Sequence, residues 1–343
     1  MRIGKKMKAA AVAVFALLLA GCSCAGKNVY FSTGLSKNDV FKINGSPCKL
    51  SESMLFLTSE KNLYENSYGS EIWTKDIAGM TFEEYVKNNV KSDLAEMKTM
   101  TLLAREKKIK LTEEELQKTR QIAETYYNGL SPAEIEYMNV KQDTVEDVYQ
   151  QYYLAKKVYN ELTREVNPEI SDADAKIIKV QGIYAKTYVI NHEGQRIEYT
   201  DEEKGRVRSD MEELLQEINN GGDFTTIASN HTDAGQVEYQ FGKGEMITEF
   251  ETAAFGMTAG QVSGIIDTPD GYYIIKCLSD YMEAETQVHK QQMIQDAKDK
   301  AFLDIYDPFI ADLTSEFNDE LWDSINFSDM KDIKVSNFYE LME

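Results

Sequence analysis

The chain has 343 residues, of which 37 are basic and 58 acidic, so its formal net charge is −21 at pH 7. A surface this acidic argues against nucleic acid as a partner and against broad contact with anionic lipid. The three histidines, His192, His231 and His289, have no cysteine or carboxylate near them at metal-ligand spacing. We therefore expect no metal site and no cofactor.

Residues 1–21 have the layout of an export signal. An apolar run, Ala9 to Ala20, follows four basic residues, Arg2, Lys5, Lys6 and Lys8. The run is short for a membrane span, and without the leader the net charge is −25. The sequence Leu-Ala-Gly-Cys at 19–22 resembles a bacterial lipobox, which implies that Cys22 becomes the lipidated first residue and holds the protein at a membrane. The alternative is an ordinary signal in which Cys22 is an incidental thiol.

Residues 22–38 are small and polar and are expected to form a tether. Cys24 lies in this tether, and residues 40–45 predict a short strand that ends in an Asn-Gly turn. Two further cysteines, Cys48 and Cys277, are too scattered to form a disulfide framework. A bridge between them is one alternative, but a buried free thiol is favoured for Cys277.

Residues 39–168 are expected to be helical. Ser51 or Ser53 is a candidate cap for a first helix, and four later helix starts have a Ser or Thr followed by acidic residues: Thr81, Thr112, Ser131 and Thr144. Pro132 fits the first helical position after Ser131. Many tyrosines and methionines lie in these helices; they either line a groove for unfolded chains or form the core.

Asn167 and Pro168 mark a boundary, after which residues 177–190 are rich in β-forming side chains. A helix is predicted from Thr200 to Ile218, followed by short helices at 225–230 and 250–255. Strands are predicted at 261–266 and 272–278. A second helical stretch is expected from Glu283 to about Phe317, with Pro308 kinking or splitting it.

Five short blocks follow one another between residues 221 and 276. They read Gly-Gly-Asp-Phe at 221–224, Phe-Gly-Lys-Gly-Glu-Met at 241–246, Phe-Glu-Thr-Ala-Ala-Phe at 250–255, Gly-Gln-Val-Ser at 260–263 and Gly-Tyr-Tyr-Ile-Ile-Lys at 271–276. Together the blocks resemble the parvulin family of peptidyl-prolyl isomerases. The resemblance implies a small antiparallel sheet wrapped by helices, in the order β-α-α-α-β-β, over residues 169–282.

The helical regions resemble the chaperone domain of SurA-type and PrsA-type foldases, through the Ala-x-x-Lys run at 104–112 and the Glu-rich helix starts. This resemblance implies an α+β protein in which residues 39–168 and 283–343 form one helical chaperone domain. The parvulin-like domain would then be inserted between its two parts.

The parvulin resemblance also implies site residues. Met246 and Phe250 stand at the family's proline-pocket positions, and Phe241 could add a third wall; the alternative is that all three pack internally. The family carries two histidines where this chain has Gly182 and Tyr273. Asp233 would supply the family's carboxylate and Tyr273 one hydrogen bond, so we expect an active site that has lost part of its polar network.

Two functions remain open. In the first, the protein is a lipid-anchored foldase on the extracytoplasmic face of a bacterial membrane, where it isomerises X–Pro bonds in unfolded exported polypeptides. In the second, the parvulin-like domain binds clients without catalysis, as part of a holdase chaperone. A structural lipoprotein without clients has only composition in its favour. Neither leading hypothesis needs a cofactor, and both are compatible with a homodimer.

Overall fold

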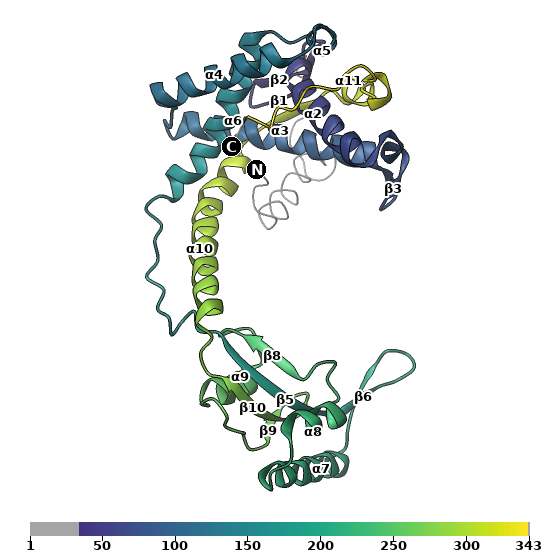
Figure 1. Ribbon diagram of the computed structural model, residues 1–343, viewed down its shortest axis with the longest axis vertical. Helices are drawn as coiled ribbons and strands as arrows, with labels where there is room; N and C mark the ends of the chain where they lie inside the picture. The colour runs from purple at the N-terminus through teal and green to yellow at the C-terminus, as the bar shows by residue number, and fades with distance from the viewer. Residues whose placement is uncertain (1–33, 342–343) are drawn as a thin grey trace. The chain divides into compact units, whose positions relative to one another are not determined.

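The computed structural model describes residues 34–341 (Figure 1). The chain divides into two compact units: the helical unit, Met1–Val166 with Asp299–Glu343, and the sheet unit, Asn167–Lys298. The sheet unit is therefore inserted between helical N- and C-terminal segments, which confirms the predicted α+β class. The predicted leader and lipidation site at Cys22 lie outside the described residues.

The helical unit combines long helices with short strands. Its helices are α2 (Leu50–Tyr68), α3 (Phe82–Glu106), α4 (Glu113–Gly129), α5 (Pro132–Met138), α6 (Gln142–Thr163), the C-terminal part of α10 (Glu283–Ala311) and α11 (Asp319–Asp323), with 3₁₀ turns at η1 (Ser70–Thr74) and η2 (Phe327–Asp329). The strands β1 (Asp39–Ile43), β2 (Ser46–Lys49) and β11 (Ser315–Phe317) form an antiparallel sheet in the order β11-β1-β2, and β3 (Asp76–Ile77) pairs with β4 (Met80–Thr81).

Three of the predicted helix starts are confirmed as capping boxes. The hydroxyls of Thr81, Thr112 and Ser131 each accept the backbone N–H three residues later, and the glutamate at that position accepts the N–H of the cap. The other two starts were predicted a few residues too late, because α2 begins at Leu50 and α6 at Gln142. Strand β2 runs directly into α2, and the Ser53 hydroxyl donates to the Lys49 carbonyl at 3.3 Å inside the first turn.

The segment after α11 runs through the helical unit mostly without regular structure. The buried carboxylate of Glu134 accepts three consecutive backbone N–H groups from it, those of Lys334, Val335 and Ser336, at 2.7–3.1 Å. The ring of Phe338 is fully buried and lies 4.2 Å from the ring of Tyr149, centroid to centroid. The C-terminal segment thus fills part of the hydrophobic core that the N-terminal helices form.

Helix α10 differs from its prediction. It continues through Pro308 as a single helix, and it ends at Ala311 rather than near Phe317. The ring of Phe302 and the side chain of Ile310 are buried against α3 and α6, and this burial offsets the hydrogen bond that proline removes. The residues predicted to close the helix instead form β11, which pairs with β1.

The sheet unit has four antiparallel strands in the order β8-β5-β10-β9. Its elements are β5 (Ile178–Lys186), β6 (Tyr188–Ile190), β7 (Arg196–Glu198), α7 (Asp201–Asn219), α8 (Phe224–His231), β8 (Glu238–Phe241), α9 (Thr248–Phe255), β9 (Ile266–Thr268) and β10 (Gly271–Ser279). Both short helices and the last strand were predicted. Strands β7 and β8 were not, whereas β6 lies within residues 177–190, which were expected to be rich in β structure. The strand expected at 261–266 is a single bridge at Val262, with β9 beginning at Ile266.

Two buried thiols lie in different units and both are free, Cys48 in the helical unit and Cys277 in the sheet unit. Burial raises the pKa of the Cys48 thiol to about 12, so it stays protonated. The alternative of a bridge between them is therefore not realised. Across residues 34–341, no helix is both long and apolar enough to cross a membrane.

Candidate active site on the sheet unit

The central strands β5 and β10 direct alternate side chains to two different cores. On one face, Ile183 and Ile274 pack against α7 and α8. On the other face, Val180 and Ile275 pack against α9 and the end of β8. The candidate site lies on this second face, which also carries four of the five predicted site residues of the sheet unit.

Phe250, on α9, is the centre of an aromatic cluster. Its ring is fully buried, with centroids 5.0 Å from Tyr273 on β10 and 5.7 Å from both Phe241 and Tyr239 on β8. The ring of Tyr273 meets that of Phe250 at 76°, the edge-to-face arrangement that aromatic pairs prefer. Phe250 and Phe241 thus form the base of the site rather than its surface.

Met246 lies at the rim of this cluster, half-buried in the loop between β8 and α9. The carboxylate of Glu251 holds the loop, because it accepts the backbone N–H of Gly244 at 2.7 Å and that of Met246 at 3.4 Å. Gly244 has φ of +82°, a conformation that glycine adopts without strain. The loop therefore presents the Met246 side chain from a fixed backbone.

Gly182 lies on the same face, beneath the ring of Tyr239. A Cβ atom added to Gly182 would come within 3.2 Å of Tyr239 Cε2 and 3.7 Å of Ile275 Cγ2. The hydroxyl of Tyr239 donates to the carbonyl of Gln236 at 3.1 Å. The space over Gly182 is thus taken by the ring of a neighbouring strand.

Tyr184 extends the cluster toward the turn between β9 and β10. It stands opposite Tyr273 in the sheet, with ring centroids 4.6 Å apart and planes at 25°, and its hydroxyl donates to the Asp270 carbonyl at 2.8 Å. Burial, with a smaller contribution from the nearby phenol of Tyr239, raises the pKa of Tyr273 to about 12. Burial also raises the pKa of Tyr184. Both phenols therefore remain neutral at physiological pH.

Asp233 lies at the edge of the site, on the β8 side of β5. Its backbone N–H donates to the Tyr184 carbonyl at 2.7 Å, and its carboxylate accepts the backbone N–H of Lys186 at 3.0 Å. The side chain is exposed and lies 3.9 Å from the Lys186 ammonium. Strand β5 separates it from Tyr273 on β10, so the carboxylate borders the site from the opposite side of that strand.

The structure therefore brings Phe241, Met246, Phe250 and Tyr273 together, and it places Asp233 at their border. Two tyrosines that belong to the cluster, Tyr184 and Tyr239, were not among the predicted site residues. Tyr184 could have been found from strand alternation, since it lies two residues beyond Gly182 on the same face. Tyr239 could not, because strand β8 was not predicted.

The half-exposed part of the site is made by side chains without formal charge, Met246 and the three tyrosines. Apolar surface over an aromatic base binds a ring of matching size, and neutral phenols donate or accept single hydrogen bonds. Within residues 34–341, no group of three histidine, cysteine or acidic side chains is placed to hold a metal ion. Such a site suits the binding of an apolar ring with a polar amide beside it.

Both the sheet unit and the chain as a whole are similar to known proteins. Residues 190–279 match the PPIC-type PPIase (rotamase) domain family. The chain is 25% identical to the foldase protein PrsA of Caldanaerobacter subterraneus over 314 residues, covering 87% of this chain and 93% of that protein. It is 32% identical over 107 residues to the peptidyl-prolyl cis-trans isomerase Pin1 of Digitalis lanata, covering 29% of this chain and 88% of that protein.

Among solved structures, the crystal structure of PrsA from Bacillus cereus is 20% identical, with a TM-score of 0.35, and the match covers 79% of this chain and all of that one. The sequence matches span both the family domain and the helical segments that flank it. They confirm the resemblance first noted from the five blocks between residues 221 and 276. The chain belongs to the PPIC-type, or parvulin, family of peptidyl-prolyl isomerases and is a PrsA-like foldase.

Proposed function

We propose that the sheet unit isomerises X–Pro bonds in unfolded polypeptides, with the proline ring held between Met246 and Tyr273. The observation that carries this proposal is the half-exposed pair of Met246 and Tyr273 on the fully buried base of Phe250. A pyrrolidine ring is apolar and flat enough to lie on such a surface, while its imide remains at the rim, within reach of neutral hydroxyls.

Isomerisation breaks no covalent bond; the imide rotates over a barrier of about 18–20 kcal/mol. The planar imide owes its stiffness to charge-separated resonance, which water stabilises by hydrogen bonding. An apolar contact that excludes water from the imide therefore destabilises the planar forms relative to the twisted one, and binding energy on the proline ring supplies the cost. In this proposal Met246 supplies the apolar wall, and Phe241 and Phe250 keep the wall rigid.

In this proposal, the tyrosine hydroxyls are the main source of hydrogen bonds to the imide. A neutral Tyr273 hydroxyl can donate to the rotating imide at any pH below about 10, because its pKa is raised to about 12. Gly182 contributes no side chain, and Tyr239 covers it. Asp233 would act on the imide only from across β5, with its carboxylate also holding the Lys186 N–H. We therefore propose an active site with fewer polar groups than is usual in the family.

The place of action follows from the leader sequence. We propose that the chain is exported, is lipid-anchored through Cys22 on the extracytoplasmic face of a bacterial membrane, and receives exported polypeptides as clients. The support is the basic start, the apolar run from Ala9 to Ala20 and the Leu-Ala-Gly-Cys sequence at 19–22. Globomycin-sensitive maturation and radiolabelled palmitate incorporation, both lost in Cys22→Ser, would test this part of the proposal.

The test of catalysis is cis–trans exchange of proline peptides, measured by NMR exchange spectroscopy with the chain from Lys27 onward, which keeps every residue that the structure describes. Met246→Ala is expected to abolish most of the acceleration, and Tyr273→Phe, which keeps the ring, to reduce it several-fold. Tyr272→Phe is the matched control, because Tyr272 directly precedes Tyr273 on β10 and packs on the opposite face. An equal loss in all three variants would contradict the assigned roles.

A second candidate is a holdase without turnover, favoured by one observation. The ring of Tyr239 fills the space over Gly182, and Phe250 has no exposed surface, so the base of the site is closed. No acceleration of peptide exchange by the unmodified chain, together with suppression of client aggregation that Met246→Ala weakens, would establish this second function in place of the first.

A further inference from the structure

The first turns of α10 are fastened to the segment that leads into β5. The backbone N–H of Ile177 donates to the hydroxyl of the fully buried Thr286 at 3.0 Å, and the carbonyl of Ile177 accepts the Met282 N–H at 2.9 Å. Three residues further along α10, His289 is half-buried, and its ring nitrogen Nδ1 lies 2.9 Å from the carbonyl oxygen of Ala175. His289 thus belongs to the junction between α10 and the sheet.

The hydrogen bond to Ala175 fixes the orientation of the His289 ring. A carbonyl oxygen can only accept, so Nδ1 carries the hydrogen atom and donates it. The neutral ring in this tautomer and the charged ring both keep that donor, so the contact does not depend on the charge of the ring. The imidazole therefore presents a defined surface to whatever packs on it.

Gly242 lies against this surface. A Cβ atom added to Gly242 would come within 2.8 Å of His289 Cε1, a distance that real Cβ atoms essentially never show, and within 3.2 Å of Nδ1 and 3.1 Å of Glu245 Oε1. Gly242 is buried and, unlike Gly244, does not have a positive φ. The close approach of the imidazole, rather than the backbone conformation, therefore explains a residue without a side chain at this position.

Gly242 also begins the loop between β8 and α9 that carries Met246. The middle of the loop is held from α9, because the Glu251 carboxylate accepts the N–H groups of Gly244 and Met246. The start of the loop rests on the His289 ring. The position of the Met246 side chain over the site therefore depends on two supports, one from α9 and one from α10.

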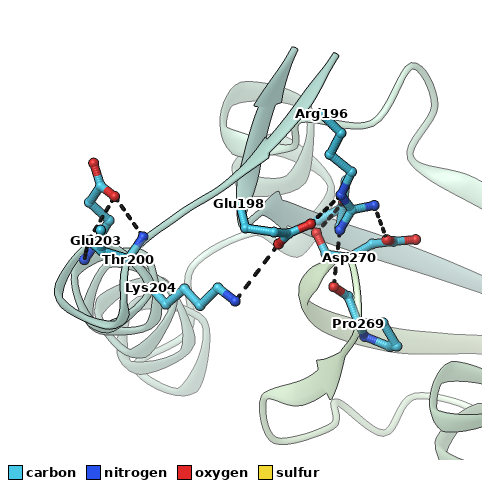
Figure 2. A network of polar contacts seen from close by, with 8 residues as sticks. Arg196, Glu198, Thr200, Glu203, Lys204, Pro269 and Asp270 are labelled. Atoms are coloured by element: carbon cyan, nitrogen blue, oxygen red, sulfur yellow. Dashed lines mark hydrogen bonds and ion pairs between the residues drawn. The ribbon is translucent and has the colours of Figure 1, made fainter. Parts of the chain in front are cut away.

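The Tyr273 side of the site has a support of another kind (Figure 2). The Arg196 guanidinium donates to the Asp270 carboxylate, and the Asp270 carbonyl accepts the hydroxyl of Tyr184, which stacks on Tyr273. The side chains of Arg196 and Asp270 are 37% and 48% exposed, so this is a surface ion pair. The two sides of the site are thus held by separate contacts, and each contact can be changed without the other.

We propose that His289 is a positioning residue, whose ring holds the start of the β8–α9 loop and thereby the Met246 wall of the proline site. This inference rests on the proposed function, which assigns Met246 that wall. Without the ring, the loop can move into the space beneath Gly242, and a displacement of about 1 Å is enough to slow a reaction substantially. His289 acts only through the loop and needs no contact with the client.

The first test measures kcat/KM by NMR exchange with proline peptides and the chain from Lys27 onward. His289→Ala is expected to lower kcat/KM about fivefold. His289→Asn, which places an amide N–H where Nδ1 lies, should stay within about twofold of the unmodified chain. Thr286→Val is the matched control, because it removes a buried hydrogen bond of the same junction without touching the loop. It should lower the free energy of unfolding of the sheet unit and leave kcat/KM unchanged.

Gly242→Ala tests the contact itself. The new methyl group collides with the imidazole, so this variant alone should lose about as much kcat/KM as His289→Ala. The double variant Gly242→Ala with His289→Ala has room for the methyl group and should lose less than the product of the two single losses. A loss equal to that product would show that the two residues act independently and would overturn the proposal.

The methyl signal of Met246 gives a readout that does not require catalysis. In a chain with isotope-labelled methionine methyl groups, this signal is identified by its absence from Met246→Ala. It should move in His289→Ala and keep its position in Thr286→Val and Arg196→Gln. A shift of equal size in either control would report general loosening of the sheet unit and would contradict the proposal.

An unmoved methyl signal in His289→Ala would also overturn the positioning role. So would an unchanged kcat/KM in that variant, or an equal loss in Thr286→Val, when the unmodified chain is active. If the unmodified chain accelerates no peptide, the proposed function fails, and the methyl signal alone then decides whether His289 holds the Met246 loop.

Discussion

In the helical unit, the rings of Tyr126, Tyr149 and Phe338 lie within 6.0 Å of one another, and the cluster is closed by the last residues of the chain. In the sheet unit, the ring of Phe250 is just as buried, but the tyrosines around it are half-exposed. The first cluster joins segments that are about 200 residues apart, whereas the second joins segments within one domain.

The tyrosine hydroxyls of the two clusters also differ in whether they bond to the chain itself. In the helical unit they bind the chain itself: the Tyr126 hydroxyl contacts Ser336 Oγ at 2.6 Å, and Tyr149 donates to the Phe338 carbonyl at 2.9 Å. In the sheet unit, Tyr273 presents a neutral hydroxyl with no hydrogen bond to another residue in the described part of the chain. The hydroxyls of the first cluster are thus used within the fold, whereas the Tyr273 hydroxyl of the second is left available, as the proposed function requires.

Among the predicted changes in free energy of unfolding, the largest is expected for Phe338→Ala in the cluster of the helical unit. Truncating a fully buried phenylalanine costs about 3–5 kcal/mol in free energy of unfolding. Both tryptophans of the chain, Trp73 and Trp322, belong to the helical unit, so urea denaturation followed by tryptophan fluorescence measures that unit. Val335→Ala is the control, since Val335 is 58% exposed. A cost below about 1 kcal/mol would show that the tail does not close the core.

Glu134→Ala is expected to cost the helical unit about 2–4 kcal/mol, because three backbone N–H groups of the C-terminal segment lose their shared, buried acceptor. Burial alone would raise the pKa of Glu134, but the N–H groups of Ser131, Ser336 and Val335 lower it overall. The carboxylate thus stabilises the fold above pH of about 4.3, and this contribution is lost as pH falls below that value.

The pH dependence of the free energy of unfolding distinguishes the contribution of the Glu134 charge from the effect of its side-chain size. Tryptophan-monitored urea curves at pH of about 7 and about 3 should differ less for Glu134→Gln than for the unmodified chain. An identical difference in the two proteins would assign the acid sensitivity of the helical unit to other carboxyl groups.

Gly182→His is expected to destabilise the sheet unit by about 1–3 kcal/mol, because the new side chain collides with the ring of Tyr239. Combining it with Tyr239→Ala, which vacates the space, should recover at least about 1 kcal/mol relative to the sum of the two single variants. Amide NMR signals of β5 and β10 in a urea titration give the three free energies. Additive values would place the two side chains out of contact.

The smallest expected effect concerns the Tyr273 phenol. Its pKa of about 12 lies above the usual value of about 10, so the neutral form stabilises the folded sheet unit below pH of about 10. This contribution is lost as pH rises from about 10 to about 12. Tyrosinate absorbance of the unmodified chain minus that of Tyr273→Phe should titrate near pH of about 12, with isomerase rates flat from pH of about 7 to about 9. A midpoint near pH 10 would mean that the phenol is solvated.

Much of the local structure could be predicted from the sequence. The capping boxes at Thr81, Thr112 and Ser131 formed as expected, because each depends only on residues three positions apart. The order of blocks between residues 221 and 276 was sufficient to name the family and to group Phe241, Met246 and Phe250 at one site. The split that was one alternative at Pro308 does not occur, because tertiary burial outweighs a local preference.

Helix starts, turns and strand alternation follow from the sequence alone, because their interacting partners lie only a few residues apart. Only the tertiary structure decided the pairing of β1 with β11, the carboxylate of Glu134 on the C-terminal segment, the ring of Tyr239 over Gly182, and the tie between Asp233 and Lys186. These partners are 47 to 276 residues apart or belong to a strand that was not predicted. Their contact depends on how whole elements pack, and no short-range spacing encodes it.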